Sequence, residues 1–156
     1  MTDAGSTLRF RGYRAADRDG CLALFDANCP SAFAPNERAE YEAFLDDAAG
    51  AYEVCVMDDE IVGAFGLGGD PALRLRWIMV HPQRQGLGIG TRVMGRVREA
   101  AGEAARDAAQ PDHASVHIAA SHRSAPFFAR FGARVVGETP DGWGPGMHRI
   151  DMVLPV

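Results

Sequence analysis

The stretch that decides the fold runs from residue 77 to residue 91 and consists of Trp77-Ile78-Met79-Val80-His81-Pro82-Gln83-Arg84-Gln85-Gly86-Leu87-Gly88-Ile89-Gly90-Thr91. Its apolar start predicts a strand, which His81-Pro82 ends, and a glycine-rich turn then opens a helix. Such a turn gathers backbone N–H groups at a helix N-terminus, where they have no carbonyl partners and the helix dipole is positive. The stretch therefore predicts a binding site for an anion such as a phosphate group.

Two common phosphate-binding patterns fit this stretch poorly. A phosphate loop of the NTPase type requires a lysine, whereas all 16 basic residues of this chain are arginine. The dinucleotide pattern G-x-G-x-x-G would place a glycine at position 91, where the chain has Thr91. That pattern also follows the first strand of its fold, and this turn follows the fourth predicted strand. A nucleotide-binding α/β protein remains an alternative interpretation.

Length and composition indicate one domain, residues 1–156, with a net charge of −5. An acidic chain is a poor match for the phosphate backbone of nucleic acids, so we expect no nucleic-acid partner. Cys21, Cys29 and Cys55 are odd in number and form no C-x-x-C pair, so we expect neither a disulfide framework nor a metal site. Because no apolar run resembles a signal peptide or a membrane span, we expect a cytoplasmic protein with no membrane partner.

Hydrophobic periodicity predicts an α/β fold with a single mixed, mostly antiparallel sheet of about seven strands, flanked by helices. The predicted strands cover residues 8–12, 52–56, 61–67, 73–80, 116–120, 135–136 and 147–154. The predicted helices cover residues 17–28, 36–50, 89–104 and 124–131, and Gly132 is expected to end the last one in a left-handed conformation. Residues 141–146 are rich in glycine and are expected to form a loop.

The pattern Q-x-x-G-x-G, from Gln85 to Gly90, resembles the coenzyme-A-binding signature of the GNAT superfamily of N-acetyltransferases. The segment from Ser124 to Ala133 lies where such proteins carry a short helix ending in F-Y-x-x-x-G-F, and the order of elements also matches. The resemblance implies a fold in which strands four and five splay apart. It also implies an enzyme that moves an acetyl group from acetyl-CoA to an amine by direct attack in a ternary complex.

The resemblance further implies where the coenzyme binds. Backbone groups of strand four would hold the pantetheine arm, one of them polarising the thioester carbonyl, and the turn would hold the pyrophosphate. The implied coenzyme-binding residues are Ile78, Met79, Val80, Gln85, Gly86, Leu87, Gly88, Ile89, Gly90 and Thr91. The acceptor is expected to be an amine, a small molecule rather than a protein, and a homodimer is left open.

Two positions depart from the family pattern. Phe128 stands where the family often has a tyrosine that protonates the leaving thiolate, and Ser121 stands where it often has an asparagine. An alkyl thiol has a pKa of about 8.5, so its thiolate leaves with little help, and Ser121 or a water molecule could act instead. The absence of the tyrosine also keeps a second hypothesis open, namely a non-catalytic sensor of acyl-CoA with the same fold.

Two residues are candidates for the base that deprotonates the amine. Glu37 shares a helical stripe with Tyr41 and Phe44, in the region that lines the acceptor pocket in the family. The alternative is that Glu37 only stabilises a helix N-terminus. His117 shares a strand face with Ser121, and histidine is a common proton acceptor in enzymes. A structural histidine hydrogen-bonded within the sheet explains the pattern equally well.

Overall fold

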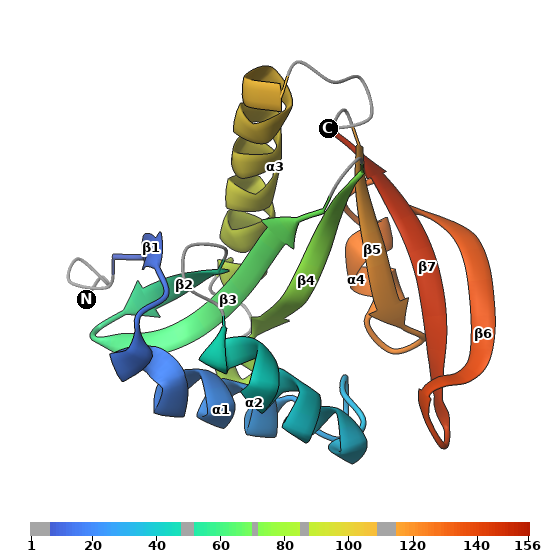
Figure 1. Cartoon of the computed structure of the whole chain (residues 1–156), viewed down its shortest axis with the longest axis horizontal. Helices are drawn as coiled ribbons and strands as arrows, with labels where there is room; N and C mark the ends of the chain where they lie inside the picture. The colour runs from blue at the N-terminus through green and yellow to red at the C-terminus, as the bar shows by residue number, and fades with distance from the viewer. Residues whose placement is uncertain (1–6, 48–51, 70–71, 85–87, 109–114) are drawn as a thin grey trace.

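The computed structural model describes residues 7–47, 52–69, 72–84, 88–108 and 115–156. Its centre is a seven-stranded sheet in the order β1-β2-β3-β4-β5-β7-β6 (Figure 1). Its strands are β1 (Arg9–Gly12), β2 (Tyr52–Met57), β3 (Glu60–Gly68), β4 (Leu73–Val80), β5 (Ser115–Ser121), β6 (Arg134–Gly144) and β7 (Met147–Pro155). Every neighbouring pair is antiparallel except β4 and β5, which are parallel, so the predicted mixed sheet is confirmed.

Helices cover both faces of the sheet. They are α1 (Arg18–Ala27), α2 (Arg38–Asp46), α3 (Ile89–Ala108) and α4 (Ala125–Ala129), together with the 3₁₀ turns η1 (Ala15–Asp17), η2 (Pro35–Glu37) and η3 (Pro82–Arg84). Helix α3 buries an apolar stripe that includes Val93 and Val97 against one face. Helices α1 and α2 pack together on the other face, over a separate cluster of buried side chains that includes Phe25 and Tyr41 (Figure 1).

The C-terminal hairpin differs from the sequence prediction. Residues 141–144 were expected in a loop, but β6 continues to Gly144, which pairs with Met147 after a register shift beyond Thr139. The carboxylate of Asp141 accepts a hydrogen bond from the Gly146 amide at 2.7 Å, and His148 Nδ1 accepts one from the Asp141 amide at 3.0 Å. These local bonds hold the two arms together, so a glycine-rich composition here builds an irregular hairpin rather than a loop.

Strand β4 contains a β-bulge in its centre. Gly66 of β3 faces Arg76 and Ala64 faces Met79, so that Phe65 alone lies opposite both Trp77 and Ile78. Trp77 has a φ of +47°, in the left-handed region that residues other than glycine rarely adopt. Before the bulge, Leu75 faces the core beneath α3, whereas Trp77 packs against the core beneath α1 and α2. The bulge therefore reverses which face of the sheet the odd-numbered side chains occupy.

A chain of hydrogen bonds and ring contacts holds the bulge in place. The hydroxyl of Tyr52 donates to the Trp77 carbonyl at 2.6 Å and lies 2.9 Å from the Tyr41 hydroxyl. Burial raises the pKa of both tyrosines far above the usual value, so both hydroxyls keep their protons. The indole ring of Trp77 also contacts the rings of Phe25, Phe33, Tyr41 and Phe44. This cluster stabilises a backbone conformation that costs about 1–3 kcal/mol by itself.

We expect Tyr52→Phe to lower the free energy of unfolding by about 1–3 kcal/mol, because it leaves the Trp77 carbonyl and the Tyr41 hydroxyl without their partner. Urea denaturation followed by circular dichroism measures this change. Tyr13→Phe is the matched control, since the Tyr13 ring contacts Tyr52 but its hydroxyl forms no hydrogen bond within the described residues. Equal stabilities for the two variants would show that the hydroxyl of Tyr52 does not support the bulge.

Candidate active site

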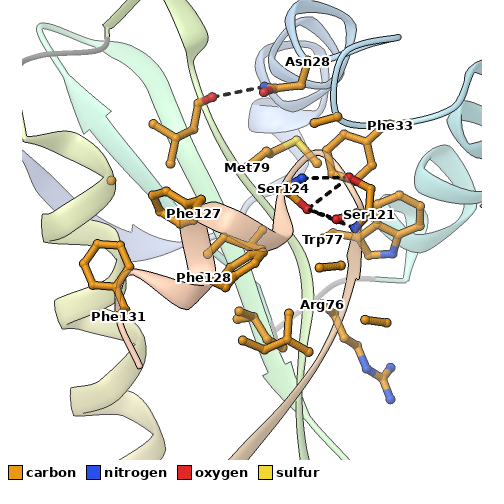
Figure 2. Close-up of a pocket in the computed structure, with 18 of the residues that line it drawn as sticks. Asn28, Phe33, Arg76, Trp77, Met79, Ser121, Ser124, Phe127, Phe128 and Phe131 are labelled. Atoms are coloured by element: carbon orange, nitrogen blue, oxygen red, sulfur yellow. Dashed lines mark hydrogen bonds between the residues drawn. The ribbon is translucent and has the colours of Figure 1, made fainter. Parts of the chain in front are cut away.

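Strands β4 and β5 separate after three residues of pairing. Leu73 to Leu75 pair with Val116 to Ile118, and beyond these residues β4 and β5 no longer pair with each other. The edges that are left, Arg76 to Val80 on β4 and Ala119 to Ser121 on β5, border a cavity of about 1060 Å³. Side chains from both strands, from the α1–α2 connection and from α4 line this cavity (Figure 2). The splayed strands that the sequence predicted are thus present, and they enclose the main cavity of the described residues.

The edge of β4 presents unpaired backbone groups to the cavity. The His81 amide donates to the Val62 carbonyl of β3 at 2.8 Å, which fixes the alternation of hydrogen bonds along this antiparallel pair. Met79 accordingly bonds to β3, while Ile78 and Val80 direct their N–H and C=O groups toward the gap. An extended ligand that lies along β4 could pair with these groups as an added strand does.

One group on this edge already has a partner. The side-chain amide of Asn28 donates to the Val80 carbonyl at 3.2 Å and to the Leu24 carbonyl at 2.9 Å. Asn28 is buried and lines the cavity, so it connects the end of α1 to the end of β4. Sequence analysis placed Asn28 only at a helix end and missed this contact, for which the sequence carries no local signal.

The N-terminus of α3 forms one end of the cavity, where Gly88, Ile89, Gly90 and Thr91 line it. The Arg92 amide donates to the Gly88 carbonyl at 3.0 Å, so the amides of residues 89–91 precede the first hydrogen bond of the helix. Gly88 has a φ of +74°, and a side chain at Gly90 would meet the Phe127 ring, because a Cβ there lies 2.8 Å from its Cε1. Both glycines are therefore required by local geometry. Gln85, Gly86 and Leu87, which belong to the predicted coenzyme site, lie outside the described residues.

The wall formed by β5 and α4 carries Ser121 and Phe128, both 4% exposed. The Ser121 amide donates to Ser124 Oγ at 3.0 Å, and the Ser124 amide donates to Ser121 Oγ at 3.1 Å (Figure 2). These bonds close the turn between β5 and α4, so Ser121 has a structural function whatever its chemistry. The Phe128 ring lies in this wall and offers no proton, in agreement with its departure from the family pattern.

Glu37 lines the cavity from η2, at the N-terminus of α2, and is 4% exposed. Its Oε2 accepts a hydrogen bond from the Ala34 amide at 2.7 Å, while its other oxygen has no hydrogen-bond partner within the described residues. The pKa of Glu37 is raised from 4.5 to about 7, and burial is the largest cause. The hydrogen bond from Ala34 lowers the pKa and the nearby charge of Glu40 raises it, each by less than burial does. A carboxyl group that titrates near neutral pH and lines a cavity suits proton transfer.

His117 and Trp143 also line the cavity. His117 is half-buried on β5, directly opposite Arg74 of β4 in the register. Trp143 of β6 donates through its indole N–H to the Ala120 carbonyl at 2.9 Å, and its own carbonyl accepts from Asn36 at 2.8 Å. Trp143 therefore joins three segments far apart in the chain and borders the cavity.

The family model of the GNAT acetyltransferase domain matches residues 21–154 of the chain. The chain belongs to the GNAT family. Membership supports acyl transfer as the general activity of this GNAT domain. No curated protein matches this sequence.

Solved structures of GNAT proteins share the fold. A GCN5-related N-acetyltransferase from Rhodopseudomonas palustris is similar with a TM-score of 0.74 and 21% identity, over 100% of both chains. Ard1 from Thermoplasma volcanium is similar with a TM-score of 0.76 and 12% identity, over 96% of this chain and 97% of its own. An aminoglycoside 6′-N-acetyltransferase complexed with coenzyme A has a TM-score of 0.67 and 14% identity, over 94% of this chain and 96% of its own. At these identities the likeness concerns the fold alone.

The GNAT fold thus brings most of the sequence-predicted site together. All three candidate catalytic residues, Glu37, His117 and Ser121, line one cavity with the described members of the predicted coenzyme site. Within the described residues, no group of His, Cys, Asp and Glu side chains is arranged to hold a metal ion. Over the same residues, no helix combines the length and the apolar character needed to span a membrane.

Proposed function

We propose that this GNAT protein is an N-acetyltransferase that uses acetyl-CoA and an amine. The observation that carries the proposal is the edge of β4 that no longer pairs with β5 beyond Leu75. There the N–H groups of Ile78 and Val80 face a cavity that ends at the first amides of α3. An extended amide-containing arm fits the strand edge, and an anionic group fits the helix N-terminus. Residues of both elements suit a pantetheine arm joined to a pyrophosphate, which supports coenzyme A as the ligand.

Acetyl-CoA would supply an activated acetyl group as a thioester. In the proposed reaction, the amine nitrogen forms a bond to the carbonyl carbon, the C–S bond breaks, the amine gives up one proton and the thiolate leaves. The protein holds the two reactants in contact, which can contribute about 7–11 kcal/mol to lowering the barrier. A backbone N–H on the β4 edge is positioned to stabilise negative charge on the carbonyl oxygen.

The amine must lose its proton, and Glu37 is the group we assign to accept it. The carboxylate is buried at the cavity wall, has a pKa of about 7, and has one oxygen with no partner among the residues that the structure describes. It can therefore attract an ammonium group and be ionised at neutral pH. His117 lines the same cavity and is the second candidate for this role.

Phe128 favours a second candidate function, a sensor that binds acyl-CoA without turning it over. Its ring cannot protonate a thiolate, and the described residues that line the cavity include no tyrosine. Release of free thiol in the presence of a panel of amines separates the two functions. We expect turnover that depends on the amine, whereas tight binding of acetyl-CoA with no thiol release from any amine would favour the sensor.

Coenzyme binding can be tested at Gly88. We expect Gly88→Glu to abolish detectable binding of coenzyme A in calorimetry, because a carboxylate would enter the cavity at the N-terminus of α3. Gly88→Ala controls for the backbone strain of a φ of +74°, and Gly95→Glu controls for an added charge on α3, since Gly95 has open space around it. Unchanged affinity in a folded Gly88→Glu variant would remove the helix N-terminus from the coenzyme site.

The function of Glu37 can be tested through the pH–rate profile. A base with a pKa of about 7 must lose its proton to act, so kcat/KM for the amine should fall below neutral pH in the native protein. We expect Glu37→Gln to lower kcat/KM by at least about tenfold and to remove this limb, with the Kd of acetyl-CoA unchanged. Glu40→Gln, at an exposed position of the adjoining helix α2, is the control. A lower melting temperature with native kinetics would instead make Glu37 a helix-terminus residue.

A further inference from the structure

Two neighbouring arginines of β4, Arg74 and Arg76, line the cavity without a carboxylate partner. Both are exposed, and neither forms an ion pair or a hydrogen bond through its side chain within the described residues. Most other arginines whose side chains have a partner form ion pairs with Asp or Glu, as Arg11 does with Asp17 and Arg96 with Glu53. In a chain with 21 acidic and 16 basic residues, two adjacent unpaired arginines at a cavity are available for an external anion.

The charges that line the cavity favour an anion as well. Glu37 is the one acid in the lining that the structure describes, and Arg130 adds a third arginine on the side of α4. Arg130 lies over the Phe127 ring, 5.6 Å from its centroid, and so belongs to the α4 wall. Arg74 and Arg76 are therefore the cations on the remaining wall, and their planar groups suit a carboxylate or a phosphate.

The face of β4 on which Arg74 and Arg76 lie indicates which ligand they can contact. Leu73 and Leu75 face the core beneath α3, so Arg74 and Arg76 project from the opposite face of β4. Because the bulge reverses the alternation, Arg76 and Trp77 lie on the same face, where Trp77 stacks with Phe33. Figure 2 shows the Arg76 side chain extending away from Phe127 and Phe131, which surround the α3 side of the cavity. The arginines thus lie on the face away from the helix N-terminus that suits the pyrophosphate.

We propose that the acceptor is an amine that also carries a carboxylate, with Arg76 and Arg74 binding the carboxylate while the amine lies toward Glu37. This inference rests on the proposed function, and it narrows the acceptor to amino acids and related carboxylate-bearing amines. The charges of a zwitterion are complementary to those of the cavity lining. Its carboxylate would lie against the arginines of β4, and its ammonium group against the buried carboxyl group of Glu37.

The test compares each of a panel of L-amino acids with its α-carboxamide, which keeps the amine and removes the negative charge. We expect the native protein to prefer the acids by at least about tenfold in kcat/KM. Arg76→Gln and Arg74→Gln should raise KM for the acids by about 10- to 100-fold and leave the carboxamides unchanged. Arg134→Gln is the control, because Arg134 is also exposed and without a partner in the described residues but does not line the cavity.

A second experiment distinguishes whether Arg76 binds the carboxylate of the acceptor or a phosphate group of coenzyme A. Calorimetry with coenzyme A and with dephospho-coenzyme A should give the same affinities in Arg76→Gln as in the native protein. A loss for coenzyme A alone would show that Arg76 binds the 3′-phosphate, and this would overturn the inference. Equal use of acids and carboxamides by the native protein would overturn it as well.

Binding measurements keep the inference distinct from the proposed function. Titration of the same acids and carboxamides into the protein saturated with coenzyme A requires no turnover. If no amine is acetylated but the acids still bind preferentially and lose affinity in Arg76→Gln, the proposed function fails and the inference stands. If acetylation occurs without any preference for acids in rate or binding, the inference fails and the proposed function stands.

Discussion

The left-handed conformation of Trp77 in the middle of β4 is the constraint on which the rest of the site depends. It inserts one extra residue opposite Phe65, and the faces of the strand are exchanged at that point. Leu73 and Leu75 can therefore complete the core beneath α3, while Trp77 and Met79 complete the core beneath α1 and α2. The Tyr52 hydroxyl and the surrounding aromatic rings stabilise a conformation that the isolated chain would not adopt.

The gap between β4 and β5 lies beside this bulge, and side chains bond to some of the backbone groups on its two edges. Beyond Ile118 the two strands no longer pair, which would leave backbone groups of both edges unpaired. Asn28 covers the Val80 carbonyl on one edge, and Ser124 covers the Ser121 amide on the other. By the alternation of the β3–β4 pair, the backbone groups of Ile78 between them point toward the gap, so the fold leaves the middle of the edge open for a ligand.

Sequence analysis predicted those features that local chemistry determines. These features are the strand before His81-Pro82, the helix that follows the glycine-rich turn, and the left-handed Gly132 after α4. All three follow from preferences of the residues themselves. The family resemblance then located the gap and the cavity. A helical stripe and the family resemblance together suggested Glu37 near the acceptor pocket, and in the structure Glu37 is buried and lines the cavity.

The features that sequence analysis missed depend on contacts between distant segments. Tryptophan has no preference for a left-handed backbone, so nothing near Trp77 indicates a bulge that Tyr52 stabilises from another strand. Asn28 and Val80 are 52 residues apart. The bulge also puts Arg76 and Trp77 on the same face of β4, and this placement was missed for the same reason. The extension of β6 is the exception, because it depends on local bonds of Asp141 with Gly146 and His148 that a glycine-rich composition does not indicate.

The central claim is that a ligand pairs with the free edge of β4, and amide hydrogen exchange resolved by NMR tests it most directly. The account predicts that coenzyme A slows exchange at the Ile78 and Val80 amides by at least about tenfold. The Met79 amide, which already bonds to β3, should exchange at the same rate with and without coenzyme A. Binding of coenzyme A with no change in exchange at Ile78 and Val80 would contradict the account.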